Sequence, residues 1–474
     1  MGSLVRFTPN RWGATGEAEG PFRNQVVSVF GGIPGEDAIV KVVAQGAHKV
    51  ATTWRTSHNP SPHRVAVRCG RYHLCGGCPM MHVDAAGQEA AHRDRVRDAL
   101  DREGLTDVAI GRFVSSPDGL DDFRHVVKLG VGFSERGALR VGAWGRATRS
   151  IVPIPECNVA TPALRTLMGT VAHHIRKLDI RPFDPLTGKG ILRAVVLRQS
   201  ASKGEMLVTL VAGKRLPLLD QLANAIRSEV REVMGVALHL NEDEGNAIFS
   251  RDEETGRIGI TMLDGRSYIE EDIDGIVHHI GPADFFQTNP RLAAALWRDA
   301  LGQMALQPDE PVVDLYCGVG TITLAAAQRT GWALGVEEVS SATEAAADTA
   351  RRHGLRAEFL TGRVAEVLEE ASPRLNDLRP VVLVNPARRG LEDGVLEQIT
   401  ALRPRRIGYI SCHPKALARD LAKFRAAGLT IGEITLYDMF PNTAHVECFV
   451  EVRDPSADGL VRRAPRRSRP GGPP

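Results

Sequence analysis

The sequence predicts an α/β protein that begins with a small β-barrel and ends in a parallel, doubly wound sheet. After about residue 280, buried apolar runs alternate with helical segments, a pattern typical of strands that helices cover on both faces. Before residue 60, short β-branched runs are separated by glycine-rich turns, as in small antiparallel barrels. The pattern between these two regions is mixed, which predicts a central α+β domain.

Length and charge exclude several classes of protein. The 474 residues correspond to about two to four domains. The chain has 59 basic and 57 acidic residues, a net charge of +2, which neither demands nor excludes a nucleic-acid partner. No run approaches the roughly 18 apolar residues of a membrane helix, and the first residues show no secretory signal. We expect a cytoplasmic protein without membrane association, and no obligate protein partner is evident.

Composition divides the chain into four expected parts. Residues 1–60 form the barrel, 61–275 the central α+β domain, and 276–455 the domain with the parallel sheet. Residues 456–474 are rich in proline, glycine and arginine, which predicts a basic, disordered tail that attracts phosphates weakly.

Individual elements follow from the apolar pattern. A helix is predicted from Asn289 and Pro290 to about residue 304, and another from Thr323 to Gln328. The predicted strands lie at residues 26–30, 38–43, 194–198, 206–211, 311–315, 333–337, 381–384 and 406–411.

The cysteines indicate a metal centre. Three lie in ten residues as Cys69-x5-Cys75-x2-Cys78, and the glycines between them let the backbone wrap around a metal. Cys157, close to two prolines, could supply a fourth thiolate. Four thiolates suit either zinc or an iron–sulfur cluster, and spacing does not separate the two. His73 and His82 lie nearby and are interpreted as bystanders.

A glycine turn predicts a nucleoside-binding site. Gly318-Val-Gly320 follows a buried strand and opens a helix, so that the backbone can approach a ligand at the helix N-terminus. Glu337 ends the next strand about 20 residues later, where an acid can bind ribose hydroxyls. Thr323 replaces the third glycine of the dinucleotide motif, which disfavours a dinucleotide.

Two further residues are candidates for catalysis. Cys412 directly follows the strand at 406–411, and the carboxyl ends of strands line the ligand crevice of a doubly wound sheet. A thiol there is placed to act as a nucleophile. The adjacent His413 is a poor partner, since neighbouring side chains on a strand point oppositely. Glu447 lies between a Pro/Asn loop and an apolar run, where it could act as a general base.

These residues together resemble the RNA uracil-C5 methyltransferase family, whose members make 5-methyluridine in tRNA and large-subunit rRNA. The resemblance covers most of the chain, and residues 1–60 resemble the family's N-terminal TRAM barrel. Five motifs occur in the same order: Cys69-x5-Cys75-x2-Cys78 with a later cysteine, Asp284-Phe-Phe-Gln-Thr-Asn-Pro290, Asp314-Leu-Tyr-Cys-Gly-Val-Gly320, Ser411-Cys412-x-Pro414, and Phe440-Pro-x-Thr443-x-His445-Val-Glu447.

The resemblance implies a Rossmann-like methyltransferase domain that uses S-adenosyl-L-methionine, and an RNA partner. It implies a 4Fe-4S cluster on Cys69, Cys75, Cys78 and Cys157. It places Gln287, Tyr316, Gly318, Glu337 and Asn385 around S-adenosylmethionine. The barrel residues that it makes candidates for RNA backbone contacts are Arg6, Arg11, Arg23, Lys41 and Lys49.

The sequence departs from the family pattern at three positions. His413 stands where Asn usually follows the nucleophile, and Asn385 stands where many members have Asp. The run from Asn385 to Gly390, Asn-Pro-Ala-Arg-Arg-Gly, is similar to that of some rRNA-modifying members, which slightly favours rRNA over tRNA. Arg363 lies in the loop after the third strand, where an Asp or Asn usually contacts adenine.

The implied reaction explains why both a thiol and an acid are present. Uracil C5 is too weak a nucleophile to take a methyl group unaided, so a thiolate, Cys412, adds to C6 and activates it. A base, Glu447, then removes the C5 proton. The target base must leave its stack to reach the pocket.

Two other functions compete with this one. An amino-group methyltransferase is the nearest, because Asn385-Pro386 is similar to its Asn-Pro-Pro-aromatic loop, although residue 388 is Arg. The other is a non-catalytic, cluster-bearing protein that binds RNA or senses redox state. The joint presence of Cys412, Glu447 and the glycine turn argues against it.

Overall fold

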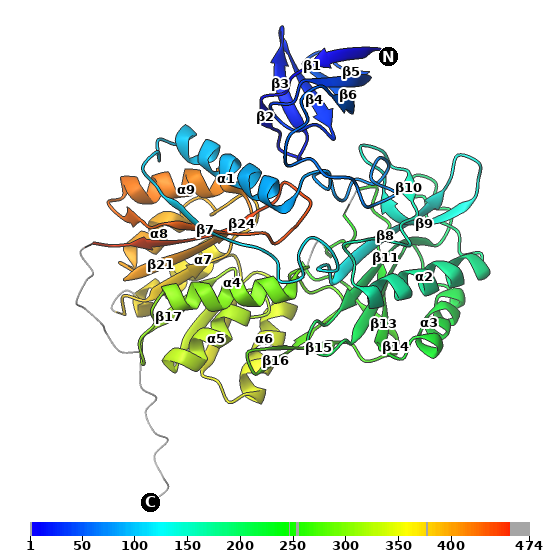
Figure 1. Ribbon diagram of the computed structural model, residues 1–474. Coiled ribbons are helices and arrows are strands. Elements are labelled where there is room, and N and C mark those ends of the chain that lie inside the picture. The colour runs from blue at the N-terminus through cyan, green and yellow to red at the C-terminus, as the bar shows by residue number, and fades with distance from the viewer. Residues whose placement is uncertain (1, 246, 253–255, 376–377, 456–474) are drawn as a thin grey trace, which may run out of the picture.

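The computed structural model describes residues 2–245, 247–252, 256–375 and 378–455. The expected basic tail, residues 456–474, lies outside the described residues. Figure 1 shows three strand-rich bodies: a small one at the N-terminus, a central sheet with helices on one side, and a large sheet with helices on both sides. No helix within the described ranges is long and apolar enough to cross a membrane.

The N-terminal body is a six-stranded, barrel-like sheet in the order β1-β5-β6-β4-β3-β2. Its small core holds Val27, Val29, Val40 and Val50. The predicted strands at 26–30 and 38–43 are confirmed as β4 and β5. The strands are β1 (Leu4–Phe7), β2 (Arg11–Trp12), β3 (Ala18–Phe22), β4 (Gln25–Phe30), β5 (Ala38–Gln45) and β6 (Lys49–Ser57).

The central sheet has seven strands in the order β10-β9-β8-β11-β12-β13-β14. Alternate residues of β11, such as Val195 and Leu197, pack in one core with helices α2 and α3, whereas Ala194 and Val196 face the other side. The elements are β8 (Val126–Phe133), β9 (Leu139–Trp144), β10 (Ile151–Val152), α2 (Pro162–Lys177), β11 (Leu192–Gln199), β12 (Met206–Ala212), α3 (Pro217–Glu229), β13 (Val233–Leu240) and β14 (Thr261–Gly265). A hairpin of β15 (Ile269–Ile273) and β16 (Ile276–Ile280) follows and packs on α6 (Ser340–Arg352).

The large sheet has the order β19-β18-β17-β20-β21-β24-β23-β7, with β22 paired to β24. Strands β17 to β21 are parallel, and β24 runs antiparallel to β21. Its strands are β7 (Ile110–Val114), β17 (Val312–Leu315), β18 (Ala333–Glu337), β19 (Ala357–Thr361), β20 (Val381–Val384), β21 (Arg406–Ser411), β22 (Thr430–Ile431), β23 (Ile434–Tyr437) and β24 (Glu447–Arg453).

Helices cover both faces of the large sheet, as the apolar pattern predicts for buried parallel strands. One core packs α1, α7, α8 and α9, and another packs α4 and α5. The helices are α1 (Ala85–Arg102), α4 (Pro290–Gln303), α5 (Thr321–Thr330), α7 (Val364–Leu375), α8 (Val395–Ala401) and α9 (Pro414–Ala426). The predicted helix from Pro290 begins as expected, because the Asn289 side chain caps it by accepting from the Leu292 amide.

An early segment of the chain completes the large sheet. The expected central domain, residues 61–275, contains α1 and β7, yet α1 packs on α9 and β7 pairs in parallel with β23. Residues 85–114 therefore belong structurally with the C-terminal sheet. This addition places α1 directly against the loop between β23 and β24, where the Asn442 amide donates to Gln88.

Replacing Phe449 by Ala is expected to lower the free energy of unfolding by about 3–5 kcal/mol. Phe449 of β24 is fully buried between Ile410 and Thr435 of the neighbouring strands, so truncation leaves a cavity in the sheet that carries the site. Urea denaturation followed by circular dichroism measures the loss. Leu186→Ala is the control: its side chain is 73% exposed, and its effect should stay within about 0.5 kcal/mol.

Candidate active site

The candidate site lies at the carboxyl edge of the large sheet. Glu337 ends β18, Asn385 follows β20 and Cys412 follows β21. Since these strands are parallel, their carboxyl ends share one edge, where open α/β sheets bind ligands. Strand β24 is antiparallel, so its first residue, Glu447, lies at the same edge.

The pairing of β21 with β24 brings Cys412 and Glu447 together. Ser411 lies opposite Cys448 in the ladder, so the next residue outward on β21 faces the preceding residue of β24. The electrostatic effect of Glu447 on the Cys412 thiol reflects this proximity. Glu447 also pairs with Tyr437 of β23, so strands on both sides fix the acid.

Burial keeps both groups protonated near neutral pH. Desolvation raises the pKa of the half-buried Cys412 thiol to about 11, and the nearby Glu447 carboxyl adds to this rise. Desolvation also raises the pKa of the buried Glu447 carboxyl to about 8. The pair therefore holds two protons that a bound substrate must help to remove.

The positive charge of Arg388 keeps both pKa values lower than burial alone would set them. Its guanidinium lowers the pKa of both Cys412 and Glu447, partly offsetting burial, and it hydrogen-bonds to the thiol. Arg388 Nη2 also lies 3.5 Å from Nε2 of His445, whose pKa burial lowers to about 4, so this imidazole is neutral and accepts. No role for Arg388 was predicted from the sequence, although its place three residues after Asn385 was a signal for one.

The His413 side chain caps helix α9. It is the N-cap of α9, and its Nδ1 accepts a hydrogen bond from the Ala416 amide at 3.3 Å. This agrees with the expectation that it is a poor partner for Cys412.

The glycine turn has the strained backbone of a ligand loop. Tyr316, Gly318 and Gly320 all have positive φ angles, of 64°, 55° and 76°. A Cβ on Gly320 would collide with Ala346 and Phe359, whereas the space above Gly318 is open. The turn therefore leaves room for a ligand at Gly318, beside the N-terminus of α5.

Glu337 is oriented toward this turn by two main-chain hydrogen bonds. Its carboxylate accepts from the Gly318 amide at 3.1 Å and from the Val339 amide at 3.0 Å. Asp314, deep in the turn, accepts from the Thr323 hydroxyl at 2.6 Å, and burial raises the pKa of its carboxyl to about 7.

The remaining predicted residues flank the turn to different degrees. Tyr316 is partly buried in the core below the edge, and burial raises the pKa of its phenol. Gln287 lies in the loop before α4. In the same loop, the Asp284 carbonyl accepts a hydrogen bond from Arg198 at 2.5 Å. Arg363 forms ion pairs with Glu392 at 2.9 Å and Glu366 at 3.5 Å, so acids of this chain already engage it.

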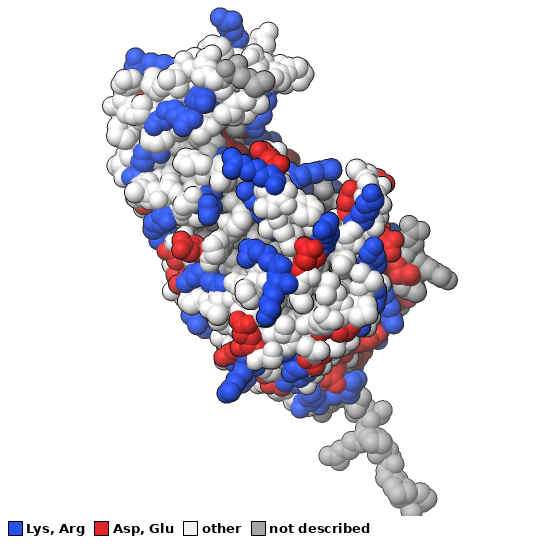
Figure 2. Space-filling model, turned by 90° about the vertical axis from the view of Figure 1, so that its right-hand side faces the viewer, with Lys and Arg blue, Asp and Glu red and all other residues white. Residues whose placement is uncertain are grey.

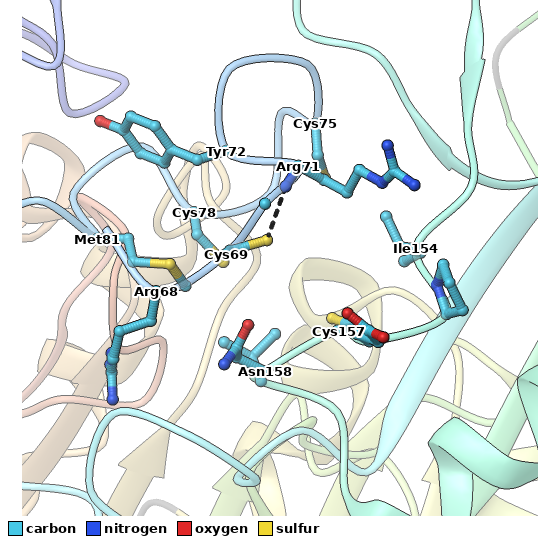
Figure 3. Close-up of a pocket in the computed structure, with 14 residues that line it drawn as sticks. Arg68, Cys69, Arg71, Tyr72, Cys75, Cys78, Met81, Ile154, Cys157 and Asn158 are labelled. Atoms are coloured by element: carbon cyan, nitrogen blue, oxygen red, sulfur yellow. Dashed lines mark hydrogen bonds between the residues drawn. The ribbon is translucent and has the colours of Figure 1, made fainter. Parts of the chain in front are cut away.

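The four predicted metal ligands line one cavity of about 390 Å³. Figure 3 shows Cys157 on a loop that faces the loop of Cys69, Cys75 and Cys78. The sulfurs of Cys69 and Cys75 each accept a main-chain hydrogen bond at 3.4 Å, from Arg71 and Gly77. Within the described ranges, however, no group of three or more His, Cys, Asp or Glu side chains is arranged to hold a metal ion.

The two nearby histidines differ in their surroundings. His82 is buried, with Nδ1 2.7 Å from the Tyr72 hydroxyl and Nε2 donating to the Gly32 carbonyl at 2.9 Å. Both ring nitrogens are engaged, as the bystander interpretation expects. His73 instead packs its ring edge-on against Tyr72.

Acids already partner several of the barrel cations. Arg6 pairs with Asp37, and both Arg11 and Lys49 pair with Glu19. Arg23 lies 5.5 Å above the ring of the exposed Phe22. Figure 2 shows Lys and Arg side chains spread over the lobe at the top of the view, with few acidic side chains among them.

Comparisons with known proteins point to one family. A family model described as tRNA (Uracil-5-)-methyltransferase matches residues 202–454, more than half of the chain. An uncharacterized RNA methyltransferase of Bacillus cereus is 31% identical over 90% of this chain and 91% of its own length. One of Clostridium tetani is 29% identical over 92% and 94%. The crystal structure of Pyrococcus abyssi tRNA (uracil-54, C5)-methyltransferase with S-adenosyl-L-homocysteine shares the fold, with a TM-score of 0.72 at 23% identity over 94% of this chain and all of that one.

Glu447→Gln is expected to remove a pH dependence of stability. The folded protein releases the Glu447 proton at about pH 8, whereas the unfolded chain releases it near pH 4.3. Wild-type stability therefore falls as the pH rises through this interval, because the folded state still holds a proton that the unfolded state has lost. The amide does not titrate, so the stability of the variant relative to wild type should increase up to about pH 8 and then level off. Urea midpoints over this range measure the difference, and a constant difference would contradict the raised pKa.

Proposed function

The chain belongs to the tRNA (uracil-5-)-methyltransferase family, and we propose that it methylates C5 of a uridine in RNA with Cys412 as nucleophile and Glu447 as base. Methylation of RNA with S-adenosylmethionine as methyl donor is the activity common to the family. The observation that carries the finer proposal is the placement of a thiol and a buried acid side by side at the ligand edge of the sheet.

The proposed reaction balances with these two side chains. The Cys412 thiolate forms a bond to uracil C6, and the C5–C6 electron pair moves toward O4 to give an enolate. C5 then takes the methyl group, whose bond to sulfur breaks and leaves neutral S-adenosylhomocysteine. Glu447 accepts the C5 proton, the C5–C6 double bond re-forms, and the C6–sulfur bond breaks to return the thiolate.

Arg388 makes both side chains easier to ionise, but the pKa of about 11 for the Cys412 thiol already includes its effect, so bound substrate must favour the thiolate further. A thiol with a pKa of about 11 supplies little thiolate at neutral pH. The guanidinium beside it stabilises the thiolate and, by the same charge, the ionised Glu447 that must act as base. We assign Arg388 this electrostatic role in addition to the two catalytic residues.

S-adenosylmethionine fits the glycine turn, where it supplies an electrophilic methyl group. Open space at Gly318 accommodates the ligand, and the oriented Glu337 carboxylate suits ribose hydroxyls. Gln287, Tyr316 and Asn385 complete the proposed binding residues. Asn385 carries no charge, so this position binds without adding a third acid to Glu337 and Asp314.

The cysteine cavity suits a 4Fe-4S cluster held by Cys69, Cys75, Cys78 and Cys157. Amide donors to the Cys69 and Cys75 sulfurs would stabilise thiolates in such a site. A four-iron cluster is wider than one ion, so its ligands surround a cavity instead of converging on a point. We place the cluster in a structural or RNA-positioning role, since the proposed reaction has no redox step.

The proposed substrate is large-subunit rRNA or tRNA, in the cytoplasm. The Asn-Pro-Ala-Arg-Arg-Gly run from Asn385 to Gly390 slightly favours rRNA. Under this proposal, residues 1–60 contact RNA, residues 61–275 carry the cluster, and residues 276–455 perform the transfer.

Methyl transfer from labelled S-adenosylmethionine to unmodified rRNA and tRNA tests this function. Wild type should give 5-methyluridine in one RNA only, and Cys412→Ala should give none, because no thiolate can add to C6. Glu447→Gln should instead accumulate a methylated RNA–protein adduct that survives denaturation, because it can add and transfer but cannot eliminate. Nucleoside analysis and gel mobility measure both results.

Two outcomes would overturn the assignment. Activity that survives in Cys412→Ala, or label on an amino group, would support an amino-group methyltransferase instead. Absence of any methyl transfer by wild type to either RNA would favour a non-catalytic RNA-binding protein.

Removing the cluster is expected to leave the methylation chemistry possible but to destabilise the protein. Cys157→Ser should lower bound iron and acid-labile sulfide together. It should also reduce the thermal midpoint of unfolding, because the cluster would no longer join the two loops that line the cavity. Cys317→Ser, at a cysteine outside the cavity, is the control for iron content. Wild type that binds zinc without sulfide after anaerobic reconstitution would contradict the cluster.

A further inference from the structure

The loop that precedes Glu447 is anchored at Asn442. We call residues 438–446, between β23 and β24, the base loop, and residues 69–83 the cysteine segment. Asn442 is completely buried and has a φ angle of +66°, a left-handed conformation that Asn tolerates better than most residues. A strained residue at the centre of a loop persists only where its surroundings fix it.

Three parts of the chain fix Asn442 through hydrogen bonds. The Met80 amide, in the cysteine segment, donates to the Asn442 carbonyl at 2.9 Å. The Asn442 amide donates to Gln88 Oε1 of α1 at 2.7 Å, and its side-chain Nδ2 donates to the Leu120 carbonyl at 2.7 Å. Every one of these partners lies more than 300 residues earlier in the chain.

Gln88 completes the junction. Its Nε2 donates to the Val83 carbonyl at the end of the cysteine segment, at 2.8 Å, and lies 3.4 Å from Asn442 Oδ1. Met80, Ala91 of α1 and Ala444 of the base loop pack in one small cluster beside these bonds. The side chain of Gln88, itself buried, therefore bridges the cysteine segment and the base loop.

We propose that Asn442 and Gln88 are positioning residues for Glu447, and that they transmit the order of the cysteine segment to the base loop. Met80 is two residues from Cys78 and Glu447 is five residues from Asn442, so one short hydrogen-bonded path joins a cluster ligand to the proposed base. The inference rests on the proposed role of Glu447 and adds a function for the cysteine segment in placing it.

The test separates positioning from folding by asking which step slows. Gln88→Ala removes both contacts to Asn442, and Asn442→Gly keeps the backbone conformation but removes the side-chain bonds. Each should lower kcat by about 100-fold, as a displaced catalytic group does, with KM values for RNA and S-adenosylmethionine near those of wild type. Each should also accumulate the methylated RNA–protein adduct, because only the step that needs Glu447 is impaired.

Gln398→Ala is the matched control. Gln398 is also a helical glutamine that donates to a main-chain carbonyl, that of Ala365 at 2.9 Å, and its loss should leave kcat unchanged without adduct. If Glu447→Gln accumulates adduct and Gln88→Ala does not, the positioning proposal is wrong and the base assignment stands. If Glu447→Gln itself gives no adduct, the proposed function fails first.

Hydrogen–deuterium exchange tests the link to the cysteine segment without measuring activity. Cys78→Ser and Gln88→Ala should both increase exchange in residues 438–447, while exchange in β17 and β18 stays as in wild type. Unchanged exchange of the base loop in Cys78→Ser, with the rest of the protein folded, would overturn the link.

Discussion

The antiparallel pairing of β24 with β21 is the constraint on which the site depends. A parallel sheet alone presents strand ends at one edge, but it leaves the start of every strand at the other. Because β24 reverses direction, its first residue returns to the edge where Cys412 follows β21. A nucleophile and an acid that are 35 residues apart in the chain thus become neighbours through main-chain hydrogen bonds, which depend little on side-chain identity.

Burial gives this pair its chemical character. A carboxyl that is almost fully buried is costly to ionise, so even beside Arg388 the Glu447 carboxyl has a pKa of about 8 and remains protonated near neutral pH. The same cation favours the thiolate. In the proposed reaction, this one charge therefore favours both the attack at C6 and the later removal of the C5 proton, and the dry surroundings strengthen its effect.

The sequence predicted several buried strands and the candidate catalytic residues, but not the groups that surround those residues. Buried runs such as Val381–Val384 are continuous and apolar, so their burial could be predicted from the sequence alone. Strand β7 was not predicted, because its half-exposed residues Ile110–Val114 carry no such run and its partner β23 is more than 300 residues away. The roles of Arg388 and Asn442 were not predicted for a related reason. Their roles come from groups that only the fold brings near them.

The cysteine segment contacts each of the three bodies of the protein. The Tyr72 ring packs on Phe30 of the barrel, and the Cys75 main chain forms an isolated β-bridge with Gly145, directly after β9 of the central sheet. The Met80 amide donates a hydrogen bond to the base loop. A single 15-residue stretch thus touches all three bodies of the protein. Such a stretch has little regular structure of its own to hold it rigid, and a group that binds three of its thiols would supply that rigidity. The relative placement of the barrel, the central sheet and Glu447 then depends on one ordered segment. Under the proposed function, this segment links the part of the chain that contacts RNA to the position of the base.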